Sequence, residues 1–344
     1  MKFISLFTPL ILLMASCQTT RKAENSASTQ KSAHLKKIDP DDLSPFEDLE
    51  SNSKSNMPPS HIAVSENRVQ TKKAHESHGS LSSFCQTELS SLPGKFSEES
   101  LKKVCRKVTV KEGCESFEEN PIFHYQKNGY SKNAKRILVL SLIHGDEFPS
   151  GSVSRSWMIR LENIEPRNSW RVIPISNPDG LHRKTRTNAR NVDINRNFPT
   201  KDWDRLALFW WRTKKKSDPR RYPGPTAASE RETQCIMKHI DEYDPHFIIS
   251  IHTPLGVLDF DGPKSIEFPR FSPLPWISLG NFPGSLGRYM WVDHNVPVLT
   301  IELKGSYGVK RLQEFDRLQD ISGTVAIQSD RILRANKQRS FNDK

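Results

Sequence analysis

A short apolar run that stops abruptly at polar residues stands out in the middle of the chain. Residues 136–143 read R-I-L-V-L-S-L-I, and branched side chains dominate them. This pattern is typical of a strand buried on both faces of a sheet. His144-Gly145-Asp146-Glu147 follows at once. Because ligands bind beyond the carboxyl ends of strands in open α/β sheets, we expect the chemistry of this protein there.

The same kind of pattern predicts alternating strands and helices from about residue 121 to 340. Apolar residues at 153, 157, 161 and 164 recur at helical spacing, which predicts a helix with one apolar face. Asn177-Pro178-Asp179-Gly180 has the composition of a turn, and Ser229 with Glu232 has that of a capping box. The alternation indicates an α/β fold with a mixed, largely parallel central sheet and helices on both faces. Strands are predicted at 122–126, 136–143, 170–175, 246–252 and 296–303, and two further helices at 229–243 and 310–336.

The first seventeen residues have the pattern of an export signal. Met1-Lys2 precedes an apolar run that is too short to span a bilayer. Met14-Ala15-Ser16-Cys17 resembles the bacterial lipobox, in which the Cys is lipidated and becomes the mature N-terminus; the alternative is an ordinary signal with a chance Cys. Gln18-Thr19 in place of an Asp favours the outer membrane by resemblance to sorted lipoproteins. We therefore expect a protein of the cell envelope, held on the outer membrane by lipidated Cys17 and facing the periplasm.

Residues 18–83 are rich in polar residues and Pro and contain few aromatics, which predicts a flexible tether. Residues 84–120 form a small segment with three cysteines, Cys85, Cys105 and Cys114, and an amphipathic helix near 98–104. In an exported protein we expect one disulfide among these three, without specifying the pair. Cys235 lies on a later predicted helix, where we expect it to be a buried, unpaired side chain. No C-x-x-C spacing suggests a Cys-based zinc site.

The chain is basic, with a formal net charge of +11 at pH 7. That charge would suit an anionic polymer or surface, such as nucleic acid, a membrane or the bacterial wall. The alternative is that Lys and Arg are scattered over a solvated surface. Because no basic stretch interleaved with aromatics indicates a nucleic-acid groove, we expect no nucleic-acid partner.

Three residues could together hold a metal ion. His144 and Glu147 lie three positions apart after a strand, and His252 ends the apolar strand 247–251. Two His and one Glu leave a coordination position for water, which is the pattern of catalytic zinc. His239 and Glu242 repeat the same spacing, but they fall in the last turn of a predicted helix, where we expect a solvated helix end.

Hydrolysis of an amide also needs a general base and groups that bind charge. Glu302 interrupts the apolar strand 296–303 and is the candidate base; the alternative is a structural ion pair with Lys304 or an Arg. The loop 186–198 is dense in guanidinium and amide groups, which capture carboxylates and oxyanions. Arg186 is the candidate for the oxyanion, and Asn195 with Arg196 for a substrate carboxylate. Otherwise the loop is simply solvated.

Five motifs occur in one order: H-G-D-E, N-P-D-G, N-A-R-N-V-D-I-N-R-N-F, S-I-H and T-I-E-L. Together they resemble the zinc carboxypeptidase family from about Pro121 to the C-terminus. The resemblance implies a sheet of about eight strands. It implies one zinc ion held by His144, Glu147 and His252, with Glu302 as general acid/base, Arg186 on the oxyanion, and Asn195 and Arg196 on the substrate carboxylate. Two departures concern Asn191, where the family often has Gly, and a substrate-binding Tyr, near whose usual spacing this chain has Phe282 and, further on, Tyr289.

Within the family, two segments resemble the branch that acts on peptidoglycan peptides. They are H-T-P-L-G-V-L-D-F-D-G-P from His252 and N-F-P-G-S-L-G from Asn281. The resemblance implies zinc-dependent cleavage between γ-D-glutamate and meso-diaminopimelate. We add the hypothesis that Asp259 or Asp261 meets the side-chain ammonium of diaminopimelate. The alternatives are a general zinc carboxypeptidase, an N-acyl amino acid deacylase of the aspartoacylase-like type, and a non-enzymatic envelope lipoprotein that binds wall peptides.

Overall fold

The computed structural model of the chain describes residues 80–272, 274–305 and 312–342. The predicted signal, Cys17 and the tether up to residue 79 lie outside these ranges. Among the helices within them, none has both the length and the apolar character that a membrane-spanning helix requires.

The described strands form a single mixed sheet of seven strands in the order β1-β2-β4-β3-β5-β7-β6. The four neighbours β4, β3, β5 and β7 run parallel, whereas β1, β2 and β6 pair antiparallel at the two sides. The mixed, largely parallel sheet is confirmed, with seven described strands instead of about eight. The strands are β1 Thr109–Glu115, β2 Pro121–Lys127, β3 Arg136–Ser141, β4 Ser169–Ile173, β5 Phe247–His252, β6 Leu255–Asp261 and β7 Val298–Lys304.

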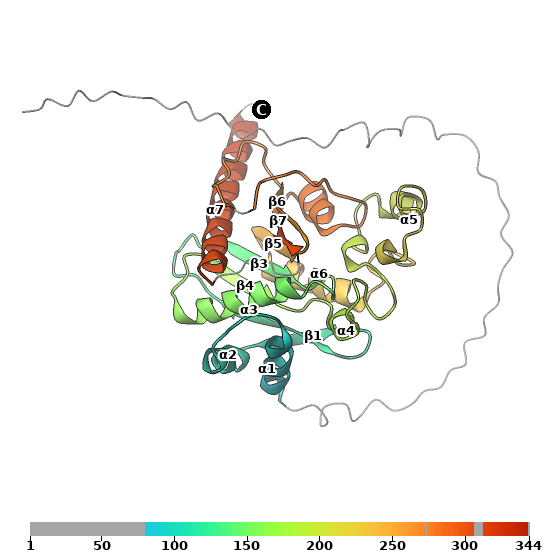
Figure 1. Cartoon of the computed structure of the whole chain (residues 1–344). Helices are drawn as coiled ribbons and strands as arrows, with labels where there is room; N and C mark the ends of the chain where they lie inside the picture. Colours follow the sequence, from blue (N-terminus) through green and yellow to red (C-terminus); the bar gives the residue numbers. More distant parts are fainter. Residues whose placement is uncertain (1–79, 273, 306–311, 343–344) are drawn as a thin grey trace, which may run out of the picture. The chain divides into compact units, whose positions relative to one another are not determined.

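Helices cover both faces of the sheet (Figure 1), as the continuous apolar character of its central strands requires. Alternate residues of β3 point to opposite faces, so Ile137 and Val139 join one core and Leu138 and Leu140 join the other. The first core is completed by α1 Leu81–Ser91, α2 Glu98–Cys105, α3 Phe148–Asn163 and α7 Leu312–Asn342. The second is completed by α6 Arg231–Tyr243 and by the loops around the site.

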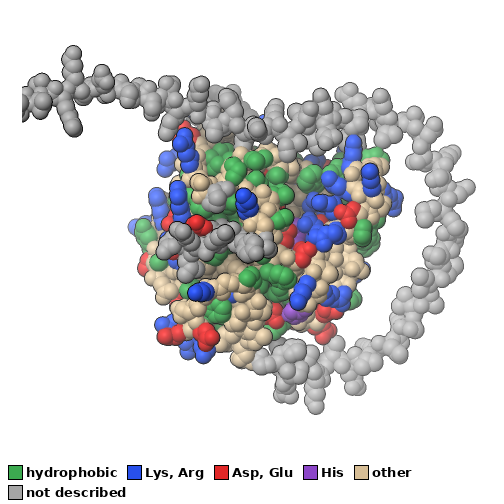
Figure 2. Space-filling model, viewed as in Figure 1, with side chains coloured by type: hydrophobic (Ala, Val, Ile, Leu, Met, Phe, Trp, Pro, Cys, Tyr) green, Lys and Arg blue, Asp and Glu red, His purple; other side chains and the backbone are tan. Residues whose placement is uncertain are grey.

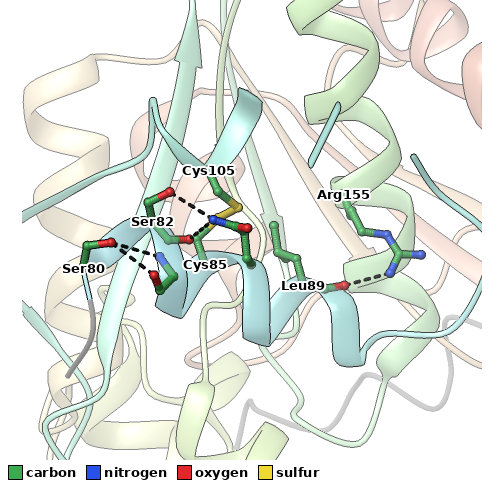
Figure 3. Close-up of a disulfide and its surroundings, with 8 residues drawn as sticks. Ser80, Ser82, Cys85, Leu89, Cys105 and Arg155 are labelled. Atoms are coloured by element: carbon green, nitrogen blue, oxygen red, sulfur yellow. Dashed lines mark hydrogen bonds between the residues drawn. A yellow bond between two sulfur atoms is a disulfide. The ribbon is translucent and has the colours of Figure 1, made fainter. Parts of the chain in front are cut away.

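The helices α1 and α2, which precede the boundary that we predicted near Pro121, pack on the first core. Cys85 and Cys105 form a disulfide that joins α1 to α2, which confirms one pair among the first three cysteines (Figure 3). Arg155 of α3 is buried and donates hydrogen bonds to carbonyl oxygens at the end of α1, those of Leu89 and Leu92 at 2.8 Å. These bonds satisfy both the buried charge and the open carbonyls of the helix end.

The expectation for Cys235 was wrong. Cys235 on α6 is joined by a disulfide to Cys114 on β1, across 121 positions of sequence. Both residues are buried. An edge strand with few apolar residues is thereby fixed covalently to the helix that covers the second face of the sheet.

Two local predictions need correction. Asn177-Pro178-Asp179-Gly180 begins a short helix, α4 Pro178–Arg183, because the Asn177 side chain accepts a hydrogen bond from the Gly180 N–H and Pro suits the first helical turn. Ser229 does not cap α6, since its hydroxyl donates to the Glu230 carboxylate at 2.6 Å. The remaining helix, α5 Trp203–Thr213, lies outside the regions that we predicted to be regular.

Candidate metal centre

The site lies at the carboxyl ends of three parallel strands. β3 leads into His144, β5 ends at His252, and β7 carries Glu302 opposite His252 in the strand register. The chain passes from β3 through α3 to β4 on one side, whereas β5 pairs on the other side of β3. A crevice forms where the connections diverge in this way, and it is the usual ligand site of such sheets.

The three predicted metal ligands meet in the structure. His144 Nδ1 and His252 Nδ1 are 3.2 Å apart, and each lies within 3.0 Å of a different Glu147 carboxylate oxygen. All three side chains are buried. They form one of two His/Cys/Asp/Glu groups in the described residues whose ligand atoms lie close enough together to hold a metal ion.

The second nitrogen of each imidazole is already engaged. His144 Nε2 lies 3.2 Å from Asp193 Oδ1, and His252 Nε2 lies 2.8 Å from Ser250 Oγ. Such contacts fix the orientation of a ligating imidazole and direct its other nitrogen to the metal. The donor set therefore fits zinc. We did not predict either partner, although Ser250 lies two residues before His252 and so on the same face of β5.

A glycine brings the metal loop close to its neighbour. A Cβ added at Gly145 would come within 2.0 Å of the Gly180 backbone. The loop that carries His144 and Glu147 can therefore lie directly on the start of α4 only because residue 145 has no side chain.

Glu302 lies half-buried on the wall of the same cavity. Burial raises the pKa of its carboxyl, the charge of Glu147 raises it further, and His252 offsets part of the effect. Among the described residues Glu302 forms no ion pair, so the structural pairing with Lys304 or an Arg is absent there. A carboxyl of raised pKa beside a metal-ligand set has the properties of a general acid/base.

Arg186 is linked to the metal ligands through Asp193. Its Nε and Nη2 donate to Asp193 Oδ2 at 3.0 and 2.9 Å, and its Nη1 lies 3.6 Å from Glu147. Asp193 is fully buried; although burial would raise its pKa, the Arg186 and His144 charges hold that pKa well below the usual range. One carboxylate thus orients both a metal ligand and the predicted oxyanion-binding residue.

Every predicted site residue that the structure describes lines one cavity of about 330 Å³. Arg196 is buried, its Nη1 donates to the Asn195 carbonyl at 2.6 Å, and its Nε has no hydrogen-bond partner among the described residues. Burial lowers the pKa of Arg196 to about 10, which leaves it charged at neutral pH. The predicted residues in the cavity wall are His144, Glu147, Arg186, Asn195, Arg196, His252, Asp259, Asp261 and Glu302.

Asp259 and Asp261 add two acids to the wall of the cavity. Asp259 is buried and accepts hydrogen bonds from the Phe260 and Leu279 N–H groups, and Asp261 accepts one from Asn281 at 3.0 Å. Burial, with the charge of Asp261, raises the pKa of Asp259 to about 7. Burial likewise raises the pKa of Asp261. Carboxyls destabilised in this way would gain from a cationic ligand.

His239 is not the solvated residue that we expected. It is fully buried against His124, and burial lowers its pKa to about 2. Glu242 is exposed and pairs with Lys111, so the two side chains do not converge on a metal. His239 also lies near Cys114 and Cys235, but the disulfide between them leaves no thiolate to bind an ion.

The structure accounts for Asn191 and shows which residue lies near the expected position of the substrate-binding Tyr. Asn191 has a φ of 60°, a left-handed conformation that Asn adopts more readily than most residues, so the loop can keep the backbone that Gly would allow. Phe282 lines the cavity, whereas Tyr289 is buried in a stacked contact with Phe198. Tyr289 therefore does not take the place of the substrate-binding Tyr.

Comparisons with known proteins extend over the same region. The zinc carboxypeptidase family profile matches residues 98–259. Murein peptide amidase A of Escherichia coli K12 is 32% identical over 179 residues, which cover 48% of this chain and 69% of that protein. The crystal structure of murein-tripeptide amidase from E. coli O157 aligns with a TM-score of 0.46 at 26% identity over 61% of this chain and 90% of that one. Bovine thrombin-activatable fibrinolysis inhibitor, in complex with tick carboxypeptidase inhibitor, aligns with a TM-score of 0.50 at 17% identity, covering 69% and 94% of the two chains.

A mixed sheet with a His-Glu-His set and a carboxyl of raised pKa at its carboxyl edge defines a metal-dependent hydrolytic enzyme. The match to the family profile and the sequence identity to the amidase show which family of metal-dependent hydrolases this is. The chain belongs to the zinc carboxypeptidase family, whose cofactor is zinc.

Proposed function

We propose that the enzyme hydrolyses the amide bond between γ-D-glutamate and meso-diaminopimelate in peptidoglycan stem peptides. The observation that carries this proposal is the distribution of charge in the cavity, which has Arg186, Arg196 and Arg221 as well as the acids Asp259 and Asp261. Diaminopimelate carries carboxylates, which the Arg side chains can bind, and a side-chain ammonium, which the Asp side chains can bind. The similarity to the murein peptide amidase supports the same substrate.

The roles of the side chains follow from their positions. A zinc ion held by His144, Glu147 and His252 would polarise the scissile carbonyl and acidify a water molecule. Glu302 takes the proton of the attacking water and delivers it to the leaving nitrogen, for which its raised pKa is suited. Arg186 stabilises the oxyanion that develops.

Arg196 and Asn195 bind the terminal carboxylate of the substrate. Arg196 is buried in the cavity wall, and its Nε forms no hydrogen bond with a described residue. A guanidinium group can hold a carboxylate through two parallel hydrogen bonds. This anchoring places the preceding amide bond next to the metal ligands and Glu302.

Incubation of the purified enzyme with L-Ala-γ-D-Glu-meso-diaminopimelate is the decisive test. We expect mass spectrometry to show release of free diaminopimelate, with loss of activity on addition of a chelator and recovery with zinc. Cleavage of N-acyl amino acids with the tripeptide left intact would instead identify a deacylase.

Asp259 is expected to recognise the distal ammonium of the substrate. Because its pKa is about 7, Asp259 is mostly neutral below pH 7 and ionised above it. The preference for the tripeptide over an analogue ending in 2-aminopimelate, which lacks this ammonium, should rise as the pH passes upward through about 7. In Asp259→Asn the preference should be about tenfold weaker and independent of pH in this range. A wild-type preference that does not change with pH would refute this assignment.

We also propose that the mature protein is anchored on the outer membrane by lipidated Cys17, which lies outside the described residues. The lipobox-like Met14-Ala15-Ser16-Cys17 supports this proposal. Replacement Cys17→Ser should move the protein from the membrane fraction to the soluble envelope fraction. A wild-type protein found wholly in the soluble fraction would disprove the anchor.

A further inference from the structure

Besides Arg186, three cationic side chains line the cavity: Arg196, Lys215 and Arg221. Arg196 forms no ion pair within 4 Å among the described residues, and Arg221 has one carboxylate neighbour, Asp218 at 3.4 Å. Lys215 lies over the rings of Trp210 and Phe282. The guanidinium groups of Arg196 and Arg221 therefore have, among the described residues, only one carboxylate within 4 Å between them, that of Asp218.

Both neighbours of Arg221 form hydrogen bonds with segments of the site, one through its side chain and one through its backbone. Arg220 donates to Asp146, in the loop between His144 and Glu147, at 2.9 Å. The carbonyl of Tyr222 accepts a hydrogen bond from the Asp193 N–H at 2.8 Å. Arg221 thus lies between a residue held by the metal loop and a residue held by Asp193, which contacts His144, and it lines the cavity from this segment.

The two guanidinium groups of Arg196 and Arg221 also affect one another. Burial lowers the pKa of Arg196, the charge of Asp193 raises it, and the charges of Arg186 and then of Arg221 lower it. Two like charges in a partly buried wall are unfavourable unless anionic groups lie between or beside them. Lys and Arg side chains also gather over the surface around α5, which adds to the positive potential on this side (Figure 2). A ligand with two carboxylates would relieve this repulsion better than a ligand with one.

We propose that Arg221 is a specificity-determining residue that binds a second carboxylate of the substrate, beside the terminal carboxylate held by Arg196. This inference rests on the proposed function. In a γ-D-glutamyl-diaminopimelate peptide two carboxylates remain besides the terminal one: the α-carboxylate of glutamate and the distal carboxylate of diaminopimelate. Arg221 selects peptides that carry such a group over peptides that end in one carboxylate alone.

Kinetics with three tripeptides test the assignment. One is unmodified, one carries an amide at the glutamate α-carboxylate, and one carries an amide at the distal carboxylate of diaminopimelate. For the wild type, one of the two amides should lower kcat/KM about tenfold to a hundredfold. In Arg221→Gln that amide should have no further effect, and Arg221→Lys should recover part of the discrimination. If both amides act equally in wild type and Arg221→Gln, the inference is overturned.

A matched control separates this effect from a general change of charge. Arg212→Gln removes the same charge from the exposed end of α5, outside the cavity, and should leave kcat/KM unchanged. A binding measurement separates the inference from the proposed function. The zinc-loaded wild type should be stabilised more by glutarate than by glutaramate in a thermal shift assay, and Arg221→Gln should lose the difference, whether or not the tripeptide is cleaved. An unchanged difference in the variant would overturn the inference even if the tripeptide is a substrate.

Discussion

Replacement of Glu302 by Gln is expected to lower kcat on the tripeptide by about a hundredfold to ten-thousandfold while the zinc content stays at that of the wild type. Gln has nearly the same shape, so the packing of β7 is retained, but its amide cannot take a proton from water or return one to the leaving nitrogen. Glu302 lies on the cavity wall opposite His252 in the register and is not part of the ligand set. Metal analysis together with steady-state kinetics measures both quantities.

The chain offers a matched control for this variant. Glu242 follows His239 at the same spacing as Glu147 follows His144, but it is exposed and pairs with Lys111. Glu242→Gln should keep full activity, because an exposed ion pair contributes little to stability. Undiminished activity in Glu302→Gln would sink the mechanism, and loss of zinc in that variant would show that Glu302 supports the ligands instead.

The sequence predicted the centre of the fold and of the site because both depend on local pattern. β3, β5 and β7 are buried on both faces, so each shows a continuous apolar run. The residue type that interrupts or ends such a run is then conspicuous. His252 at the end of β5 and Glu302 within β7 are found by this reasoning, and their proximity follows from parallel pairing.

The two outermost strands could not be predicted in the same way. Cys114 is the only buried residue of β1, since an edge strand offers little apolar surface to the core. β6 carries acids at Asp259 and Asp261 because residues on one side of the strand, Leu255, Asp259 and Asp261, line the cavity. In β1 the polar residues of the edge remove the alternation that marks a strand, and in β6 the alternation is confined to the four residues Leu258-Asp259-Phe260-Asp261.

Contacts between segments that are distant in the sequence could not be predicted either. Asp193 was assigned no role, although it orients both His144 and Arg186. Its role depends on the way the loop 186–198 folds back on the metal ligands. The conformation of this loop cannot be predicted from the spacing of its residues. The partner of Cys114 was missed for a related reason. Cys235 lies 121 positions away, on a helix whose apolar pattern gave no sign of a disulfide.

Removal of the Cys114–Cys235 disulfide is expected to cause the largest loss of stability of any change outside the site. Closing a loop of 121 positions strongly restricts the unfolded chain, so replacing both cysteines with Ala should lower the free energy of unfolding by about 2–5 kcal/mol. The Cys85–Cys105 disulfide closes only 20 positions, so the same replacement there should cost less. Denaturant unfolding of the two double variants measures the difference.

Neither disulfide contributes a residue to the cavity wall, so kcat of the folded variants should stay near that of the wild type. Equal losses from the two disulfides would show that loop length does not govern their contributions, and that local packing around each pair does.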